Sequence, residues 1–393
     1  MRVLGAGHSF NTIADSPGAL ISLDGLPGEI EIDSANATVR AGASTRYAEL
    51  AAKLDKNGLA LANMASLPHI TVAGATATGT HGSGSRNGSL ATAIRAIELI
   101  TADGGQVTIP EHEIDAAAVS LGALGVITSL TLSLVPSFTV RQRVYDNLPA
   151  AALAGGFDEI FASAYSVSAF TTWRDPDVID MLWVKDLADQ PARPGTWHGA
   201  TAADGPRHPV PGMPAEFTTA QHDAEGPWHE RLPHFRAEFL PSTGDELQTE
   251  YLLPRDAAAG AIEALGELAP RIAPLLLINE IRTIAADDLW LSPCYGRDSV
   301  ALHFTWRKEP DAVAKLLPDI EAALAPFEPR PHWAKVFTMP PEKVRDAYPR
   351  MGDFARLAHG YDPDGKFRNE FLTGILPNNT LPNNTLPNKA LEA

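Results

Sequence analysis

Residues Leu61–Gly84 read LANMASLPHITVAGATATGTHGSG, and the prediction of the fold rests on this stretch. Ser, Thr and Gly surround two histidines, and no acidic side chain interrupts the run. Small residues let the backbone approach a ligand closely, and hydroxyl and N–H groups can surround an anion. The stretch lacks the Gly-Lys-Ser/Thr of a P-loop, and no helix pattern follows as in a dinucleotide fingerprint. We expect a loop around an anionic ligand; the alternative is a tight Gly/Ser turn cluster.

A second glycine-rich stretch lies at the start of the chain. Arg2–Leu4 has the character of a short buried strand and runs directly into Gly5-Ala6-Gly7-His8-Ser9-Phe10-Asn11. A histidine in a glycine turn at the end of a strand is placed for contact with a ligand, although His8 taken alone could be a turn residue.

Together the two stretches resemble the FAD-binding elements of the vanillyl-alcohol-oxidase type of flavoprotein, and within that type the alditol oxidases. The resemblance continues to about Leu376 through LGALGVIT at 121–128, HPVPGMP at 208–214, GPWHERLPHFRAEF at 226–239, EIRT at 280–283, HFTW at 303–306, PHWAKVF at 331–337 and DPDGKFRN at 362–369. It covers nearly the whole chain and implies an enzyme that binds FAD.

The composition is that of a globular protein that acts on small molecules. With 393 residues and 45% hydrophobic content, the chain is long enough for two domains. Its net charge of −17 argues against nucleic acid or an anionic membrane surface as a partner. The single cysteine, Cys294, excludes an internal disulfide framework, and neither a membrane-length apolar span nor a signal peptide is visible. We expect a cytoplasmic monomer in which Cys294 fills the core.

The chain opens inside the first motif. In the family that it resembles, another strand and a helix normally precede the strand that carries RVLGAGHSF. Two explanations remain open: the natural start lies upstream, or the FAD cradle lacks one wall. We favour the first, because every motif downstream is intact.

Alternation of apolar and polar residues predicts strands at Ala19–Leu23, Glu29–Asp33, Ala37–Ala41, Ala93–Ala102, Gln106–Ile109 and Thr128–Val135. The first three are expected to share one small sheet, and Asp103-Gly104-Gly105 should turn a hairpin. Arg46–Lys56 has apolar residues at helical spacing and ends at Asn57-Gly58, which predicts a helix.

We predict an α+β fold with a domain boundary near Ser137–Val140. Residues 1–138 would form an N-terminally incomplete FAD-binding domain of two small α/β subdomains. Residues 139–340 would form a substrate or cap domain on a mixed sheet, and 341–376 a C-terminal segment that packs back towards the flavin. The five-residue repeat in 377–393 is predicted to be disordered.

Two of the later predicted strands place polar side chains on one face. In Leu276–Ile284, Glu280 and Arg282 are two residues apart and therefore share a face, and the same spacing joins His303 to Thr305. The first pair could equally be a solvated ion pair, and the second an exposed sheet face.

A third segment, His332–Phe337, is expected to alternate in the same way. Trp333 and Phe337 would then flank the ammonium of Lys335 with aromatic rings. The alternative is a cation–π contact at the surface.

The resemblance implies roles for these side chains. It places substrate-binding groups at Ser66, Glu280, Arg282, Thr305 and Lys335. Because a polyol offers only hydroxyl groups, a carboxylate, hydroxyls and cations must converge on it. Lys335 and Arg282 are expected to stabilise the alkoxide and the negative charge that develops on the flavin. His303 is expected to accept the hydroxyl proton, because an imidazole ordinarily titrates near neutral pH.

The resemblance also implies that FAD is attached covalently to His8. It places the cofactor contacts at Val3, Leu4, Gly5, Ala6, Gly7, His8, Ser9, Ser66, Thr71, Gly74, Thr78, Gly79, Thr80, His81, Gly82, Ser83, Ile127 and His332. No spacing suits a zinc site, so we expect His69 and His81 to be structural hydrogen-bonding residues and no metal to be bound.

The function that follows is an FAD-dependent oxidase that converts alditols such as xylitol and sorbitol to aldoses, with oxygen reduced to hydrogen peroxide. Two alternatives remain: an aldonolactone oxidase or dehydrogenase of the same family, and an inactive, N-terminally truncated remnant.

Overall fold

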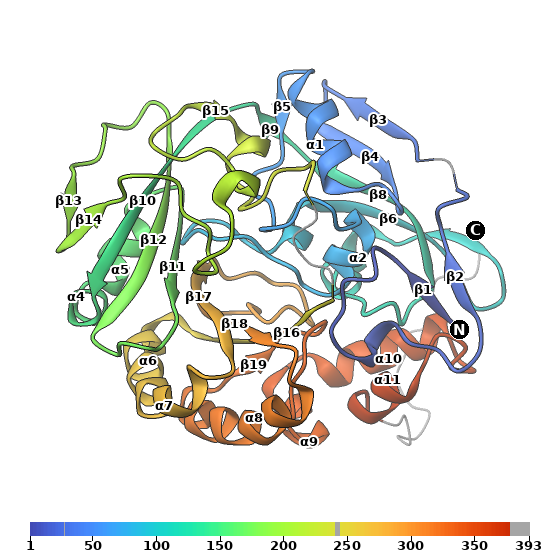
Figure 1. Cartoon of the computed structure of the whole chain (residues 1–393). Helices are drawn as coiled ribbons and strands as arrows, with labels where there is room; N and C mark the ends of the chain where they lie inside the picture. The colour runs from blue at the N-terminus through green and yellow to red at the C-terminus, as the bar shows by residue number, and fades with distance from the viewer. Residues whose placement is uncertain (27, 240–243, 378–393) are drawn as a thin grey trace.

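The computed structural model describes residues 1–26, 28–239 and 244–377, which form two larger β-sheets with helices between and beside them (Figure 1). The principal strands are β1 (Arg2–Leu4), β2 (Leu20–Ser22), β3 (Ile30–Asp33), β4 (Thr38–Gly42), β5 (Leu59–Ala60), β6 (Ile94–Ile100), β7 (Gln106–Thr108), β8 (Val126–Ser133), β9 (Val135–Pro136), β10 (Thr139–Pro149), β11 (Ser166–Thr171), β12 (Val178–Leu187), β13 (Thr196–Trp197), β14 (Ala200–Ala202), β15 (Gly226–Pro227), β16 (Glu246–Pro254), β17 (Leu276–Ile284), β18 (Ser299–Arg307) and β19 (Arg330–Pro331).

The α-helices are α1 (Tyr47–Asp55), α2 (Val72–Ala77), α3 (Ile114–Ala117), α4 (Ala150–Gly155), α5 (Phe157–Ala162), α6 (Ala258–Glu267), α7 (Ala269–Ile272), α8 (Pro310–Leu324), α9 (Pro341–Ala347), α10 (Met351–Tyr361) and α11 (Glu370–Ile375). The α+β prediction is confirmed. None of the helices in the described ranges is both long enough and apolar enough to cross a membrane.

The N-terminal part contains two small sheets. β1 pairs in parallel with β2, and a separate five-stranded sheet has the order β3-β4-β8-β6-β7. The predicted strands, the helix after Arg46 and the hairpin between β6 and β7 are confirmed. One expectation is wrong: the strand within Ala19–Leu23 does not join β3 and β4 but pairs with β1.

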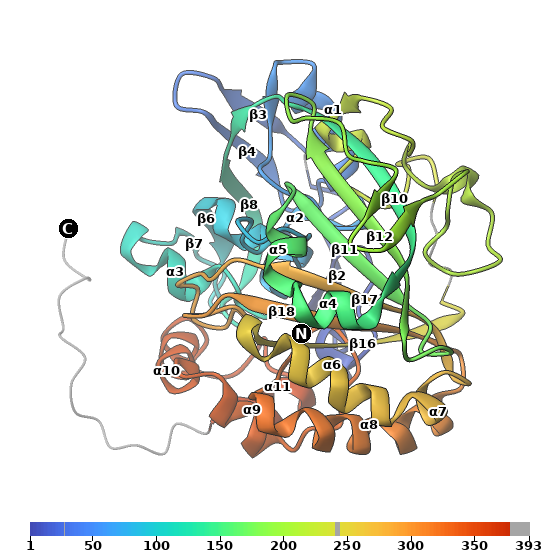
Figure 2. The ribbon, with the colours of Figure 1, turned by 90° about the vertical axis from the view of Figure 1, so that its left-hand side faces the viewer.

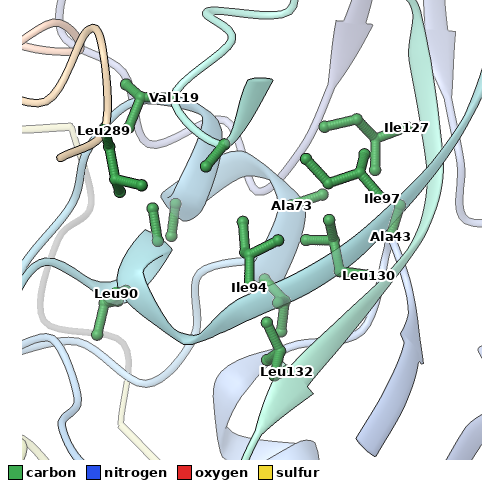
Figure 3. Packing of buried hydrophobic residues seen from close by; sticks show 14 of the residues in the cluster. Ala43, Ala73, Leu90, Ile94, Ile97, Val119, Ile127, Leu130, Leu132 and Leu289 are labelled. Carbon is green, nitrogen blue, oxygen red and sulfur yellow. The ribbon is translucent and has the colours of Figure 1, made fainter. Parts of the chain in front are cut away.

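The stretch expected to be a loop, Leu61–Gly84, contains the short helix α2. Its alanines are small enough for the helix to pack closely on the five-stranded sheet. Figure 3 shows Ala73 of α2 beside Ile97 and Leu130, which project from neighbouring strands β6 and β8. Leu130 and Leu132 of β8 are buried and two residues apart, so they share the apolar face that makes this contact.

The large sheet has ten strands and follows the path β13-β14-β10-β12-β11-β17-β18-β16-β19, with β15 beside β10. We expected a mixed sheet; instead, every pairing among its described strands is antiparallel. Helices α6 to α9 lie along one side of this sheet in both views (Figures 1 and 2). Ile281, Leu302 and Tyr251 point from its strands into the core that α6 and α8 complete. The opposite face of these strands is therefore free to line a cavity.

The C-terminal helices return to the N-terminal part. Val344, Phe354 and Leu372 belong to the same apolar core as the five-stranded sheet. Asn369 donates from its side-chain amide to the carbonyls of Thr12, Ile13 and Asp15 at 2.9–3.1 Å. This segment therefore holds the beginning of the chain in place. The predicted disordered tail lies outside the described residues, apart from Pro377.

Candidate active site

A cavity of about 680 Å³ lies between the small sheets and the large sheet. Loops around β1, α2 and β8 line one end, and strands β16 to β18 line the other. Its size is typical of a site for a small molecule or an organic cofactor.

The polar end of the cavity is produced by strand register. Glu280 on β17 stands opposite His303 on β18, and His303 stands opposite Glu250 on β16. Directly paired residues point to the same face of a sheet, so these three side chains form one row. Arg282 and Thr305 share that face because each is two residues from a member of the row.

Glu250 is the centre of this group. It is 1% exposed, and its Oε1 accepts a hydrogen bond from Arg282 Nη2 at 2.6 Å while its Oε2 accepts one from Lys335 Nζ at 2.6 Å. His81 Nε2 lies 3.3 Å from Oε1. Burial raises the pKa of Glu250, but Lys335 and Arg282 outweigh that effect and hold the pKa well below its ordinary value. Glu250 is thus an ionised carboxylate between two cations.

Lys335 does not lie on a strand, contrary to expectation. The sheet strand β19 ends at Pro331, and the chain turns through 333–335. Trp333 is fully buried and donates from its indole Nε1 to the carbonyl of Leu291 at 2.7 Å, so it does not flank the ammonium. The side chain of Lys335 instead contacts Glu250 and His303 Nδ1. Burial lowers the pKa of Lys335 to about 8, close to neutral pH.

His303, the predicted proton acceptor, has a partner at each ring nitrogen. Its Nδ1 faces the amine of Lys335, which donates, and its Nε2 therefore carries the proton and donates to Thr305 Oγ1 at 3.2 Å. Burial, followed by Lys335, lowers the pKa of His303 to about 4 instead of leaving it near neutral. Both ring nitrogens are engaged, so the ring transmits a hydrogen bond from Lys335 to Thr305.

Glu280 and Arg282 are 6% and 5% exposed, which excludes the solvated ion pair considered above. Arg282 Nε lies 3.6 Å from Glu280 Oε1, and Arg282 Nη1 lies 3.5 Å from Ser66 Oγ. Ser66 is held in place by its carbonyl, which accepts from the backbone N–H of His234 at 3.0 Å. Ser66, Glu280 and Arg282 therefore meet at the cavity wall.

The turn that carries Lys335 is tied to the first glycine cluster. Asn11 donates from its side chain to the carbonyls of Trp333 and Lys335 at 2.8 and 2.7 Å, and Phe10 N donates to Ala334 O at 2.8 Å. These bonds bring His8 to the same cavity as Lys335. Burial, followed by the charge of Lys335, lowers the pKa of His8 to about 4, so its imidazole is neutral with a free lone pair at neutral pH.

The other end of the cavity has the properties that FAD requires. Gly5 and Gly74 both border the hydroxyl of Thr71, and a Cβ on either glycine would lie 2.8 Å from Thr71 Oγ1. Arg2 also lines the cavity; its guanidinium donates to the carbonyls of Leu121, Gly122 and Phe367 and forms no ion pair among the described residues. An uncompensated cation beside closely approaching backbone fits a cofactor with a negatively charged diphosphate.

Most of the expected site residues line this one cavity. They are Val3, Leu4, Gly5, Ala6, Gly7, His8, Ser9, Ser66, Thr71, Gly74, Thr78, Thr80, His81, Ile127, Glu280, Arg282, His303, Thr305, His332 and Lys335.

Three residues expected to contact the cofactor do not line the cavity. A Cβ on Gly79 would face Pro293, one on Gly82 would lie 2.3 Å from the carbonyl of Met64, and Ser83 donates its hydroxyl to the carbonyl of Val167. Gly82 is therefore required by close backbone packing, and Ser83 ties the loop to β11.

The prediction from the sequence did not include two candidate functional residues, Glu250 and His234. Glu250 could have been found by the spacing argument applied to β17, because Gln248 and Glu250 are two apart on β16 and share the cavity face. His234, which donates to Glu280, lies in an irregular segment with no periodicity to indicate its direction.

His69, His81 and Cys294 make structural contacts. His69 Nε2 lies 2.7 Å from the carbonyl of Ala237, and His81 Nδ1 lies 2.9 Å from that of Gly82. Cys294 is 1% exposed, and burial raises the pKa of its thiol to about 12, which makes it the expected core residue. Within the described ranges, no three His, Cys, Asp or Glu side chains are grouped as metal ligands.

Known proteins are similar to this chain in sequence, and a solved structure is similar to it in fold. Residues 1–110 match the family described as FAD binding domain, and residues 245–375 match D-arabinono-1,4-lactone oxidase. An alditol oxidase from Streptomyces sp. is 52% identical over 375 residues, which are 94% of this chain and 89% of the relative. An L-gulono-1,4-lactone dehydrogenase from Mycobacterium tuberculosis is 29% identical over 397 residues, covering 96% of this chain and 90% of the relative.

A solved structure of cholesterol oxidase from B. sterolicum superposes with a TM-score of 0.77 at 17% identity, and the match covers 96% of this chain and 89% of the other. At that identity the similarity concerns the fold alone.

Proposed function

The chain belongs to the alditol oxidase family of FAD-dependent, vanillyl-alcohol-oxidase-type flavoproteins, and from this premise we propose that it oxidises alditols such as xylitol and sorbitol to aldoses, with oxygen as acceptor. The observation that carries the proposal is the row of Glu280, His303 and Glu250, with Arg282 and Lys335 beside it, on one wall of the cavity. Such a wall satisfies several hydroxyl groups at once, which a substrate with a hydroxyl on every carbon requires.

The chemistry that FAD supplies when bound is uptake of a hydride from the carbinol carbon and transfer of the two electrons to oxygen, which gives hydrogen peroxide. The protein must then hold the substrate, remove the hydroxyl proton and stabilise the charge that develops on the oxygen.

Lys335 is the proposed proton acceptor. Its Nζ contacts Glu250 Oε2 and His303 Nδ1, so the neutral amine that forms when Lys335 loses a proton can still donate to both. The lone pair is then left for the cavity that Lys335 lines. The pKa of about 8 lies closer to neutral pH than that of any carboxylate or histidine in the row, which suits a group that accepts the proton of a substrate hydroxyl.

Arg282 is the proposed electrostatic partner. Its guanidinium lies between Glu250 and Ser66 and stays charged at every working pH, because its pKa is raised overall: burial lowers it, but Glu280 and Glu250 outweigh burial. A fixed cation in a cavity shielded from water stabilises the alkoxide as it forms.

His8 is the proposed attachment point for the flavin. His8 follows β1 and lines the cavity, and the pKa of its imidazole is lowered. These features support a neutral, nucleophilic imidazole directed at the cofactor. A covalent link would hold the ring system in one place relative to Lys335.

The match of 245–375 to D-arabinono-1,4-lactone oxidase favours an aldonolactone as the second candidate substrate. Peroxide release should be measured with xylitol, sorbitol and L-gulono-1,4-lactone, in parallel with reduction of a dye that can replace oxygen. Turnover of xylitol and sorbitol above the lactone supports the proposal. Preference for the lactone would contradict it, and dye reduction without peroxide would assign a dehydrogenase.

A further inference from the structure

Two buried side chains that the proposed reaction does not use lie beside Glu280 of the substrate wall, and one of them, His234, also lines the cavity. Lys185 Nζ on β12 lies 3.2 Å from His234 Nδ1, and His234 Nε2 lies 2.7 Å from Glu280 Oε1. Lys185 and His234 are 1% and 5% exposed. Burying a lysine and a histidine costs free energy, so their retention next to Glu280 calls for a function.

The contacts of Lys185 define its protonation state. Nζ lies 2.5 Å from the carbonyl of Leu232, 3.1 Å from that of Pro233 and 3.2 Å from His234 Nδ1. These three atoms can accept the three protons of an ammonium group. Burial lowers the pKa of Lys185 to about 7 although Glu280 raises it, so the ammonium predominates below neutral pH.

The donor at Nδ1 fixes the tautomer of His234. The ionised carboxylate of Glu280 can only accept, so Nε2 carries the proton, and Nδ1 of the neutral ring is unprotonated and accepts from the Lys185 ammonium. Burial lowers the pKa of His234 to about 4, which keeps the ring neutral. The rings of Phe170 and Trp183 stand edge-on to the imidazole at 5.6 and 5.1 Å and restrict its rotation.

Glu280 is thereby held with one oxygen engaged and the other available. Oε1 accepts from His234, while Oε2 makes no hydrogen bond within the described part of the chain, and Glu280 lines the cavity. Burial raises the pKa of Glu280, but Arg282 and His234 outweigh it and hold the pKa below its ordinary value.

We propose that Lys185 and His234 are positioning residues for the substrate, which orient Glu280 through a single fixed histidine tautomer so that its Oε2 accepts a hydrogen bond from a substrate hydroxyl. The inference rests on the proposed oxidation of alditols. Because Glu280 contacts a hydroxyl and not the reacting proton, loss of the relay should weaken binding and leave the chemical step nearly intact.

The kinetic test replaces the histidine in two ways. His234→Leu removes the donor to Glu280, and KM for xylitol should rise roughly 10- to 100-fold with little change in kcat, as expected for loss of a hydrogen bond to a charged group. His234→Gln keeps an N–H near the position of Nε2 and should restore KM close to that of the wild type. Lys185→Met should raise KM in the same direction.

Two controls separate positioning from packing. Gln142 is a buried polar residue of β10 that stands opposite Lys185 of β12 in the strand register and does not contact His234. Gln142→Leu should therefore leave KM unchanged. In a Glu280→Gln background, His234→Leu should have almost no further effect, because the relay acts only through Glu280. Additive effects of His234→Leu and Glu280→Gln would overturn the proposal, as would equal KM values for His234→Leu and His234→Gln.

A measurement independent of turnover tests the tautomer directly. In protein labelled with ¹⁵N-histidine, the ring of His234, assigned by its absence in His234→Gln, should show an unprotonated Nδ1 and a protonated Nε2 at pH 6. Lys185→Met should weaken this preference, because Glu280 is then the remaining partner that favours it. If the wild type oxidises no alditol but shows this tautomer, the proposed function fails while the relay geometry stands; the opposite tautomer overturns the inference. Should Lys185→Met not fold, the pair of His234 variants still decides between the outcomes.

Discussion

Replacing Lys335 by methionine tests the proposed proton acceptor most directly. Methionine has nearly the same length but cannot bind a proton or donate to Glu250 and His303. Loss of a general base typically lowers the rate by about 100- to 10,000-fold, so kcat at pH 8 should fall by at least about 100-fold. KM should change little, because Arg282, Glu280 and Thr305 remain in the cavity wall.

The pH dependence of kcat/KM gives a more specific test of the same role. With the pKa of Lys335 at about 8, only the neutral amine can accept a proton, so kcat/KM should rise with pH up to about 8 and then level off. Below that pH it should fall by about tenfold per unit, since each unit reduces the neutral fraction tenfold. Lys335→Met should lose this acidic limb altogether.

The assay is rapid mixing of enzyme and xylitol with detection of flavin reduction, together with steady-state peroxide release, from pH 6 to pH 10. The exposed Lys343 on α9 supplies the control, because Lys343→Met removes a lysine that does not line the cavity and should leave the profile unchanged. A wild-type profile that falls above pH 8 would mean that the ammonium is the active form. A Lys335→Met enzyme with normal kcat and raised KM would make Lys335 a binding residue, and either result refutes the reasoning.

Three further outcomes are expected. Glu250→Gln leaves two buried cations without their carboxylate and should lower the free energy of unfolding by about 3–5 kcal/mol. The control is Glu98→Gln at the partly exposed pair with Arg40, which should lower it by about 1 kcal/mol or less. Denaturant titration measures both values. His8→Ala should release yellow flavin into the supernatant on acid precipitation, and a colourless wild-type pellet would contradict covalent attachment. The pKa of His234 is 6.5 in the unfolded chain and about 4 in the folded protein, so the unfolded chain binds more protons between these two pH values. The free energy of unfolding should therefore decline as the pH drops from about 6.5 to 4. Thermal unfolding should show a smaller decline for His234→Gln than for the wild type.

Local pattern determined much of the secondary structure. Strand β6, the hairpin at Asp103-Gly104-Gly105 and helix α1 follow from side-chain periodicity and turn residues, which act over a few positions and need no distant partner. The same holds for Glu280 and Arg282, because residues two apart on a strand point to the same face whatever lies opposite. Resemblance to known motifs supplied the cofactor and the class of reaction.

Only the tertiary structure decided how these side chains are partnered. Strand order brings Glu250 opposite His303, and the bonds of Asn11 to the 333–335 turn carry Lys335 to the same place; both contacts join segments far apart in the chain. The pKa of Lys335 and the tautomer of His303 depend on burial and on those partners, so an isolated sequence position cannot specify them. The same physical reason underlies the proposal of Lys335 in place of His303 as proton acceptor, and the contact of Lys185 with His234 beside Glu280.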